Sequence, residues 1–230
     1  MPDILLIETA TSKCSVALMR GERICAYRES EEPRAHAAMT AVFIDSILKE
    51  QGLKAAGLDA VCVSAGPGSY TGLRVGSSSA KGICFGAGIP LLSVSTLDIL
   101  AAKAIDDGLL PEGCKYIVPM VDARRMEVYS ALYSPEGKRL GEIEPDIVEE
   151  KSFAGPLGEG PVLFIGDGAG KCREVLAGAN AHFAQCCPDA RAMLRPTLEA
   201  WNEKRFENTA YFEPFYLKQY VATVSKKKLF

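Results

Sequence analysis

The sequence is poor in histidine and has no paired cysteines. Its two histidines, His36 and His182, lie far apart, and neither has a His, Cys or carboxylate at ligand spacing around it. The eight cysteines are scattered, and no two of them are spaced as CxxC. Zinc sites need clustered thiolate and imidazole ligands, so a zinc centre is not expected. Several cysteines lie in apolar runs, where buried free thiols are the ordinary outcome.

Long apolar runs and an excess of basic residues are also missing. No hydrophobic segment approaches the ~18 residues that a membrane-spanning helix needs, and the net charge is −3. The charge excludes a broad basic surface, so any RNA contact is expected to be local or made through a partner. The lysines at 226–228 are expected to form a solvated tail, with RNA contact as the alternative. No signal-peptide pattern precedes the first strand, which predicts a cytoplasmic location with reduced thiols.

The sequence does contain enough apolar residues for a sizeable core. Of its 230 residues, 48% are hydrophobic and 24% are charged, which suits one large domain or two small lobes. Strands are predicted at residues 4–7, 15–19, 23–28, 60–63, 91–94, 117–121 and 127–133. Helices are predicted at 36–51, 72–85 and 96–105, the last capped by Ser95 or Thr96. This order predicts an α/β fold, with a mixed sheet flanked by helices.

Two segments of the chain resemble each other. Residues 7–18 and 121–132 align without a gap, and each has an apolar strand ending in an acidic residue, a short turn and a second strand. One interpretation is a duplicated plan with two lobes, and the alternative is a chance likeness between two hairpins. The duplicated plan predicts an N-terminal lobe at residues 1–106 and a smaller C-terminal lobe at 107–230.

A glycine-rich loop, SAGPGSYTGLR at residues 64–74, precedes the second predicted helix. It lacks the lysine of a P-loop and does not fit the Rossmann GxGxxG, so a phosphate role is only weakly indicated. In the helix that follows, Gly72, Gly76 and Ala80 lie on one face. Glycine inside a helix costs up to ~1 kcal/mol, so this face indicates close approach by another element. That element is either the chain's own sheet or a partner helix.

The first predicted helix has two apolar stripes. Met39, Phe43 and Ile47 lie nearly opposite the stripe that contains Ile44 and Leu48. A surface helix has one apolar stripe, so two stripes indicate burial on both sides, within this chain or against another. We favour a partner interface formed by both helices, with these residues: Met39, Phe43, Ile47, Gly72, Leu73, Gly76, Ser79, Ala80 and Ile83.

Acidic residues end the equivalent strands of the repeat. Glu8 and Asp122 occupy these positions. In two-lobed folds that split nucleotides, such acids hold magnesium through water, and the alternative is that they are ordinary turn residues. Glycine pairs follow two other strands and could receive a nucleotide or merely turn the chain. The candidate nucleotide site, interpreted as vestigial, consists of Glu8, Thr9, Gly66, Gly68, Asp122, Gly166 and Gly168.

Several motifs together resemble the TsaB family over essentially the whole chain. They are IETATSKCSVAL, GPGSYTGLRVG, GIPLLSVSTLDILA, DARRMEVY and PFYLKQYV. The resemblance implies an actin-like, RNase H-like fold of two lobes, the second of them reduced. Where the family is expected to have Asp after the first strand, this chain has Glu8, and the longer carboxylate weakens an inherited magnesium role.

The related catalytic family, TsaD, has a metal-binding V-N-H-x-x-x-H segment. When this pattern is aligned with residues 94–100, Thr96 and Leu100 occupy the positions of the two histidines. Neither side chain replaces imidazole as a ligand. The resemblance therefore implies a chain that kept the fold and lost the chemistry, with no catalytic residue, no metal and no cofactor of its own.

The resemblance further implies a role in forming N6-threonylcarbamoyladenosine at position 37 of tRNAs that read codons starting with A. The chain would be a non-catalytic dimerisation and support subunit that binds and activates a TsaD-like catalytic subunit through its first two helices. A TsaE-like ATPase would complete the complex, and tRNA would be met through the complex. Alone, the chain would pair with itself. ATP and magnesium, where present, would bind at a subunit junction.

Two other functions compete with this one. A metallopeptidase of the glycoprotease type needs metal histidines and a nucleophile, and the sequence offers neither. A free-standing ATPase or kinase of the same fold needs a phosphate-binding lysine and a complete second lobe. Tight binding of ATP by the isolated chain would favour this ATPase or kinase function over the support role.

Overall fold

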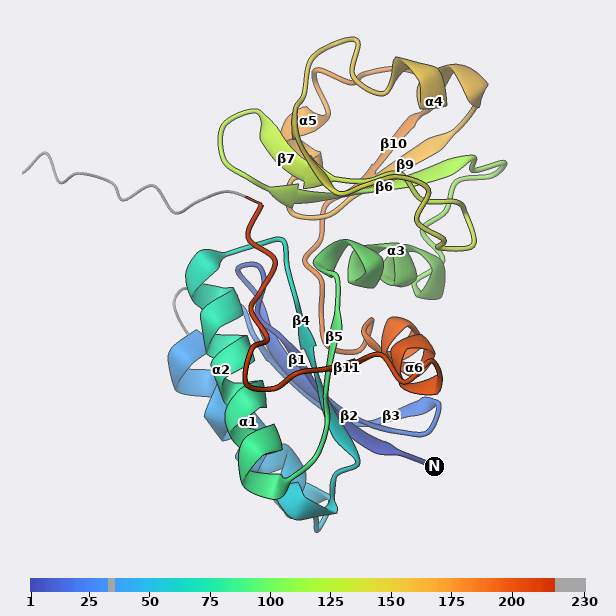
Figure 1. Cartoon of the computed structure of the whole chain (residues 1–230). Helices are drawn as coiled ribbons and strands as arrows, with labels where there is room; N and C mark the ends of the chain where they lie inside the picture. Colours follow the sequence, from blue (N-terminus) through green and yellow to red (C-terminus); the bar gives the residue numbers. More distant parts are fainter. Residues whose placement is uncertain (33–35, 218–230) are drawn as a thin grey trace, which may run out of the picture.

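Two lobes, each built around a β-sheet, stack on one another in the computed structural model, which describes residues 1–32 and 36–217 (Figure 1). The basic run at 226–228 and the last four residues of PFYLKQYV lie outside the described residues. Within the described part, none of the helices has the length and hydrophobicity needed to cross a membrane.

The first sheet has six strands: β1 (Asp3–Glu8), β2 (Cys14–Arg20), β3 (Arg23–Ser30), β4 (Ala60–Ser64), β5 (Leu91–Val94) and β11 (Phe206–Glu207). Their order is β11-β5-β4-β1-β2-β3. The first three strands form the predicted antiparallel meander. In contrast, β1, β4 and β5 run parallel, because helices return the chain to the same edge each time.

Helices cover both faces of this sheet. On one face lie α1 (His36–Glu50) and α2 (Tyr70–Ala87), and on the other lie α3 (Thr96–Asp106) and α6 (Leu194–Asn202) (Figure 1). A short 3-10 turn, Ala55–Gly57, leads from α1 into β4. The predicted cap is confirmed at Ser95, whose hydroxyl accepts from Leu97 N at 3.2 Å.

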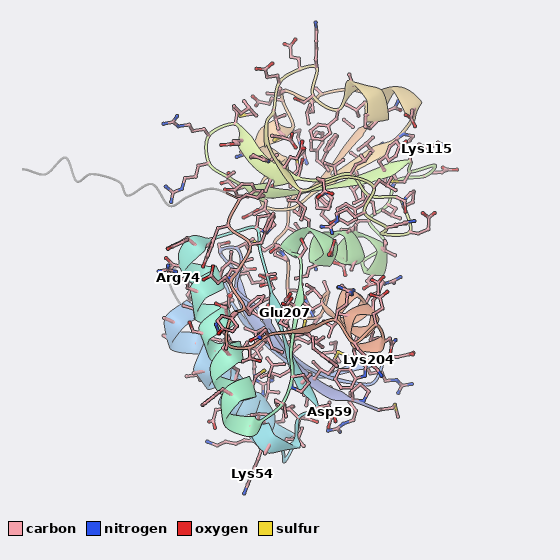
Figure 2. All side chains as sticks on the ribbon, in the orientation of Figure 1. Lys54, Asp59, Arg74, Lys115, Lys204 and Glu207 are labelled. Carbon is pink, nitrogen blue, oxygen red and sulfur yellow. The ribbon has the colours of Figure 1, made fainter. Side chains whose placement is uncertain are left out.

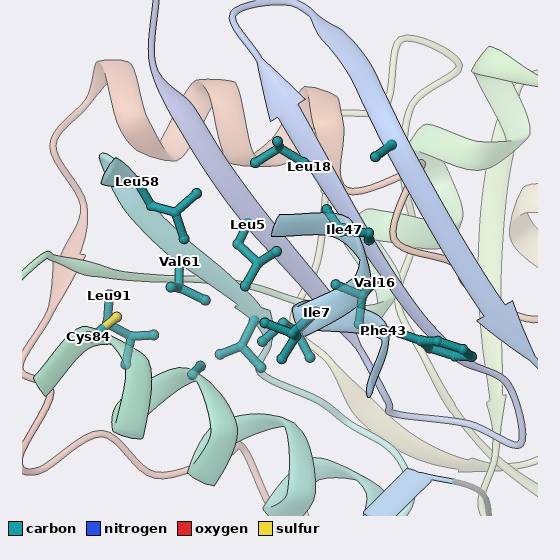
Figure 3. Packing of buried hydrophobic residues seen from close by; sticks show 14 of the residues in the cluster. Leu5, Ile7, Val16, Leu18, Phe43, Ile47, Leu58, Val61, Cys84 and Leu91 are labelled. Carbon is teal, nitrogen blue, oxygen red and sulfur yellow. The ribbon is translucent and has the colours of Figure 1, made fainter. Parts of the chain in front are cut away.

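The strands of this sheet are buried on both faces. Leu5 and Ile7 of β1 pack against the α1–α2 layer, as Figure 3 shows, whereas Ile4 and Leu6 pack on the side of α6. Successive side chains point to opposite faces, so an uninterrupted apolar run is what a doubly covered strand requires. Each of these buried side chains stabilises the fold by about 1.5–3 kcal/mol. The sheet and its helices are therefore the main source of stability.

The second sheet repeats the plan of the first. Its strands are β6 (Tyr116–Asp122), β7 (Glu127–Ser130), β8 (Glu144–Ile147), β9 (Val162–Ile165) and β10 (Ala181–Ala184), with the short helices α4 (Ala154–Glu159) and α5 (Ala169–Cys172). The order β10-β9-β6-β7-β8 corresponds strand by strand to β5-β4-β1-β2-β3. The duplicated plan is confirmed at this level, and so is the predicted α/β fold class with mixed sheets flanked by helices.

Helix α3 lies between the two sheets. Its Leu97 and Leu100 pack against Ile117 and Val121 of β6, while Ile99 packs with the core of the first sheet. One helix thus contributes to the cores of both lobes, and Figure 1 shows it lying between them.

The C-terminal part of the described chain does not follow the predicted division into two lobes at residue 106. After β10 the chain returns to the first lobe, where α6 packs on β5 and β11 pairs with it. Lys81 Nζ then donates to the carbonyl oxygens of Ala210 and Phe212, and Phe215 N donates to Ala65 O at 2.7 Å. The first lobe is therefore built from both ends of the described chain, not from residues 1–106 alone.

Candidate functional site

The glycine loop packs against the chain's own β1–β2 turn. Ser69 N donates to Ala10 O at 2.6 Å, and the Ser69 hydroxyl caps α2 by accepting from Gly72 N. A Cβ at Gly68 or Gly72 would overlap a carbonyl oxygen of that turn, and one at Gly76 would overlap the Thr9 hydroxyl. The glycines therefore allow a strand turn and a helix start to touch. The structure gives them a packing role within this chain.

This packing corrects part of the predicted partner interface. Six of its nine residues are buried in the chain's own first lobe: Phe43, Ile47, Gly72, Leu73, Gly76 and Ala80. Met39 and Ile83 are partly buried against the same core, and Ser79 donates to Val75 O within the helix. The prediction of partner contact is wrong for the buried six. The sheet itself covers the small-residue face, which was the alternative left open.

The outer sides of α1 and α2 carry a different set of residues. Phe85 is 89% exposed and Val42 is 54% exposed. A Cβ at Gly82 or Gly86 would have no atom within 4 Å, so nothing in the described chain explains these helix glycines. We define the docking face by six of the exposed residues of these two packed helices, all of them small or apolar: Ala38, Ala41, Val42, Ser78, Gly82 and Phe85.

The sequence did contain a signal for this face. Phe85 lies nine residues after Gly76, which at about 100° per residue places the two on opposite sides of the helix. Gly76 faces the sheet, so Phe85 faces outward. The structure thus exposes a large apolar ring on the side of α2 that faces away from the sheet.

The candidate nucleotide residues come together where strands of the two lobes end. Glu8 is the last residue of β1 and is fully buried. Its Oε1 accepts from Ala10 N at 2.5 Å, and its Oε2 has no hydrogen-bond partner among the described residues. Burial raises the pKa of Glu8 to about 8, with smaller contributions from the charges of Asp189 and Asp167. The raised pKa favours the uncharged carboxyl at neutral pH, which is a poorer magnesium ligand than a carboxylate. That the chain has no cofactor of its own stays a prediction.

Asp122, the equivalent acid of the second lobe, is engaged differently. Lys171 Nζ donates to its Oδ1, which also accepts from Arg124 N at 2.8 Å. The neighbouring Asp167 accepts from Asp122 N at 2.9 Å, and burial raises its pKa. The Lys171 ammonium group therefore compensates the charge of Asp122 within the chain. The two acids of the repeat therefore have different environments and are both used within the chain.

The glycine pairs after β4 and β9 are equivalent in the repeat. Gly66 and Gly166 both have positive φ, at 102° and 134°. Gly168 N donates to Met120 O at 3.0 Å, and a Cβ at Gly166 would lie 3.0 Å from the Met120 carbonyl carbon. These glycines also serve close backbone approach. A phosphate-binding role for them stays a prediction.

Neither of two cavities in the described chain is lined by the candidate nucleotide residues. One, of about 360 Å³, lies under the C-terminal segment beside Ser93 and Phe215. The other, of about 520 Å³, lies between α3, α6 and residues 136–139. In residues 1–32 and 36–217, no group of three His, Cys, Asp or Glu side chains is placed to hold a metal ion.

The buried Glu8 predicts a pH-dependent stability. Its folded pKa lies above the ordinary value of 4.5, so its contribution is fully present below about pH 4.5 and is lost as the pH rises through 8. Relative to Glu8→Gln, the wild type should lose up to about 1.4 kcal/mol of unfolding free energy per pH unit in that window. Urea unfolding of both proteins at pH 5 and pH 8 measures this. A constant difference between them would contradict the buried protonated carboxyl.

Comparison with known proteins decides the family. The family model described as "TsaD: tRNA N6-adenosine threonylcarbamoyltransferase" matches residues 30–224. The tRNA threonylcarbamoyladenosine biosynthesis protein TsaB of Bacillus subtilis (strain 168) is 32% identical over 174 residues, covering 71% of this chain and 70% of that protein. The chain belongs to the TsaB family. The TsaB protein of Escherichia coli (strain K12) is 35% identical over 155 residues, covering 64% of this chain and 65% of that protein.

A solved structure agrees with this family. YeaZ from Pseudomonas aeruginosa superposes with a TM-score of 0.82 at 28% identity, covering 94% of this chain and all of that one. The alignment to the Escherichia coli TsaB spans a little under two thirds of that protein. In this TsaB family member, Thr96 and Leu100 are both fully buried, at the positions that the TsaD metal pattern gives to histidine.

Proposed function

We propose that this TsaB family chain is the non-catalytic dimerisation and support subunit of the complex that forms N6-threonylcarbamoyladenosine at position 37 of tRNAs reading codons that start with A. It binds and activates a TsaD-like catalytic subunit. The observation that carries the proposal is the docking face, where Phe85 is 89% exposed on an otherwise small-residue surface. Its relatives are named for biosynthesis of this modified nucleoside.

The chemistry of the docking face suits a pair of partner helices. Ala38, Ala41, Ser78 and Gly82 present little side-chain volume, so another helix can approach the backbone closely. Phe85 then inserts as a large apolar anchor, the type of residue that dominates binding energy at interfaces. The same face serves a second copy when the partner is absent, which accounts for the proposed homodimer.

The surroundings of the two acids that end the equivalent strands support a non-catalytic role. Glu8 is buried with a pKa of about 8, and Asp122 is paired with Lys171. A phosphoryl-transfer site needs acids free to hold a metal ion and a donor for the phosphates. Both acids are engaged elsewhere here. ATP and magnesium are therefore proposed only at a junction with another subunit, where a TsaE-like ATPase completes the complex.

The proposal includes tRNA contact through the assembled complex and a cytoplasmic location. The described cysteines are all free thiols. Burial raises the pKa of Cys62 to about 12, which keeps that thiol protonated and unreactive. A reducing compartment suits a chain with so many unpaired thiols.

The test of the proposal is complex formation. The chain is mixed with a TsaD-like subunit and analysed by size-exclusion chromatography with light scattering. We expect the mass of a heterodimer and loss of the homodimer peak. A titration of the isolated chain with ATP and magnesium tests the ATPase alternative, for which sub-millimolar binding is required. Independent elution of the two subunits would contradict the proposal.

A further inference from the structure

The β6–β7 turn holds two arginines in an unusual backbone conformation. Arg124 and Arg125 have φ values of 73° and 52°. Side chains with a Cβ rarely adopt this region, and turns that need it normally use Asn or Gly. The turn is fixed by Arg124 N, which donates to Asp122 Oδ1 at 2.8 Å, and by Ala123 N, which donates to Glu127 O at 3.1 Å. The chain keeps arginine where the backbone favours other residues.

The charges of these arginines are not used within the described chain. Both residues are exposed, and in residues 1–32 and 36–217 neither guanidinium makes a hydrogen bond or an ion pair. Two acids, Asp122 and Glu127, flank the arginines in sequence, and Asp122 is paired with Lys171. Lys171 Nζ also donates to Glu127 O, which ties the base of the turn to α5. The turn therefore presents two exposed guanidinium groups, with no ion pair to the described residues, on a well-anchored support.

The turn lies on the same side of the molecule as the docking helices. In Figure 1 the connection between β6 and β7 projects from the upper lobe above the N-terminal end of α2. Arg74, labelled on that side in Figure 2, is also exposed, and its guanidinium lies 4.2 Å from the centre of the Tyr70 ring. Basic side chains from both lobes thus border the side where the partner is proposed to bind.

We propose that Arg124 and Arg125 bind phosphate groups of the RNA that the complex modifies. The proposal rests on the function proposed above. The guanidinium fork matches phosphate oxygens and stays charged at every physiological pH. The chain carries a net charge of −3, so its overall charge does not attract a polyanion and RNA contact is expected at a local basic element. The docking face is apolar and small, so a protein partner there does not require these charges.

The experiment measures tRNA affinity of the assembled complex at several salt concentrations. The logarithm of the binding constant falls as the logarithm of the salt concentration rises. For Arg124→Gln/Arg125→Gln, the loss of two phosphate contacts should make this negative slope shallower by about 1.4–1.8. We expect affinity at low salt to fall at least about tenfold. Arg124→Lys/Arg125→Lys should retain most of the slope. The matched control, Arg23→Gln/Lys204→Gln, removes two other exposed charges, one at the start of β3 and one in the turn after α6, and should leave the slope unchanged.

Three results would overturn the inference. One is an unchanged slope in the double glutamine variant. Another is an equal fall in slope for the control. The third is weaker binding of the TsaD-like subunit with an unchanged RNA slope, which would assign the arginines to acidic groups of the protein partner. The variant Arg124→Asn/Arg125→Gly suits the backbone of the turn, so a lower melting temperature cannot explain its loss of RNA affinity. Failure of the wild-type chain to form the complex would instead contradict the proposed function.

Discussion

Replacing Gly72 with alanine is expected to lower the free energy of unfolding by about 2–4 kcal/mol. The new Cβ would overlap Thr9 O, with the carbonyl carbon of the same residue at 3.3 Å. Both atoms are backbone, so the turn and the helix must separate for the methyl group to fit. Replacing Gly82 with alanine should instead raise the free energy of unfolding, because alanine favours a helix by about 0.5–1 kcal/mol over glycine.

These two substitutions form a matched pair within one helix. Both exchange hydrogen for methyl in α2, and they differ only in what the methyl group meets. Urea unfolding monitored by circular dichroism gives both free energies. Equal effects at the two positions would contradict the orientation of α2 on the sheet. The same orientation predicts that Gly76→Leu unfolds the protein, because Val63 lies 3.3 Å from the Cβ position.

Replacing Phe85 with alanine is expected to weaken binding of the TsaD-like subunit by about thirtyfold or more. Truncation of a central aromatic anchor at an interface costs about 2 kcal/mol or more. Val42→Glu should have a comparable effect, because it places a charge in the apolar part of the docking face. Both side chains are exposed in the free chain, so neither change should lower its melting temperature by more than a few degrees. Calorimetric titration measures the affinity.

The control for the docking face is another exposed apolar side chain. Ile147, at the edge of the second sheet, is 67% exposed and lies outside the face. Ile147→Ala should bind the partner with wild-type affinity. Full affinity of the Phe85 and Val42 variants, or an equal loss in the Ile147 variant, would contradict the assignment of the face.

Much of the fold could be predicted from the sequence because its cores are simple. Uninterrupted apolar runs such as residues 4–7 and 60–63 mark strands covered on both faces, and a gapless internal likeness indicated the two-lobed plan. The return of the C-terminal segment to the first sheet could not be predicted. β11 has only two residues, and its pairing with Leu91 and Leu92 depends on tertiary contacts rather than on a local pattern.

The sequence analysis placed the partner interface on sides of α1 and α2 that pack on the sheet, whereas the docking face proposed above lies on the exposed sides of the same helices. Glycine, alanine and serine together occur on most sides of α2, so composition does not say which side meets the sheet. Only the contacts separate Gly72 and Gly76, which touch Thr9, from Gly82, which touches nothing. The raised pKa of Glu8 could not be predicted from the sequence either, because it follows from burial and not from the residue's identity.

Reconstitution of the modification tests the central claim most directly. A TsaD-like subunit, a TsaE-like subunit, unmodified tRNA and an enzyme that supplies threonylcarbamoyl-adenylate are combined, and modified adenosine is quantified with and without this chain. The account predicts that product requires the chain, while the chain with tRNA and the adenylate alone makes none. Product formation that is unaffected by omitting the chain would contradict its role as the support subunit.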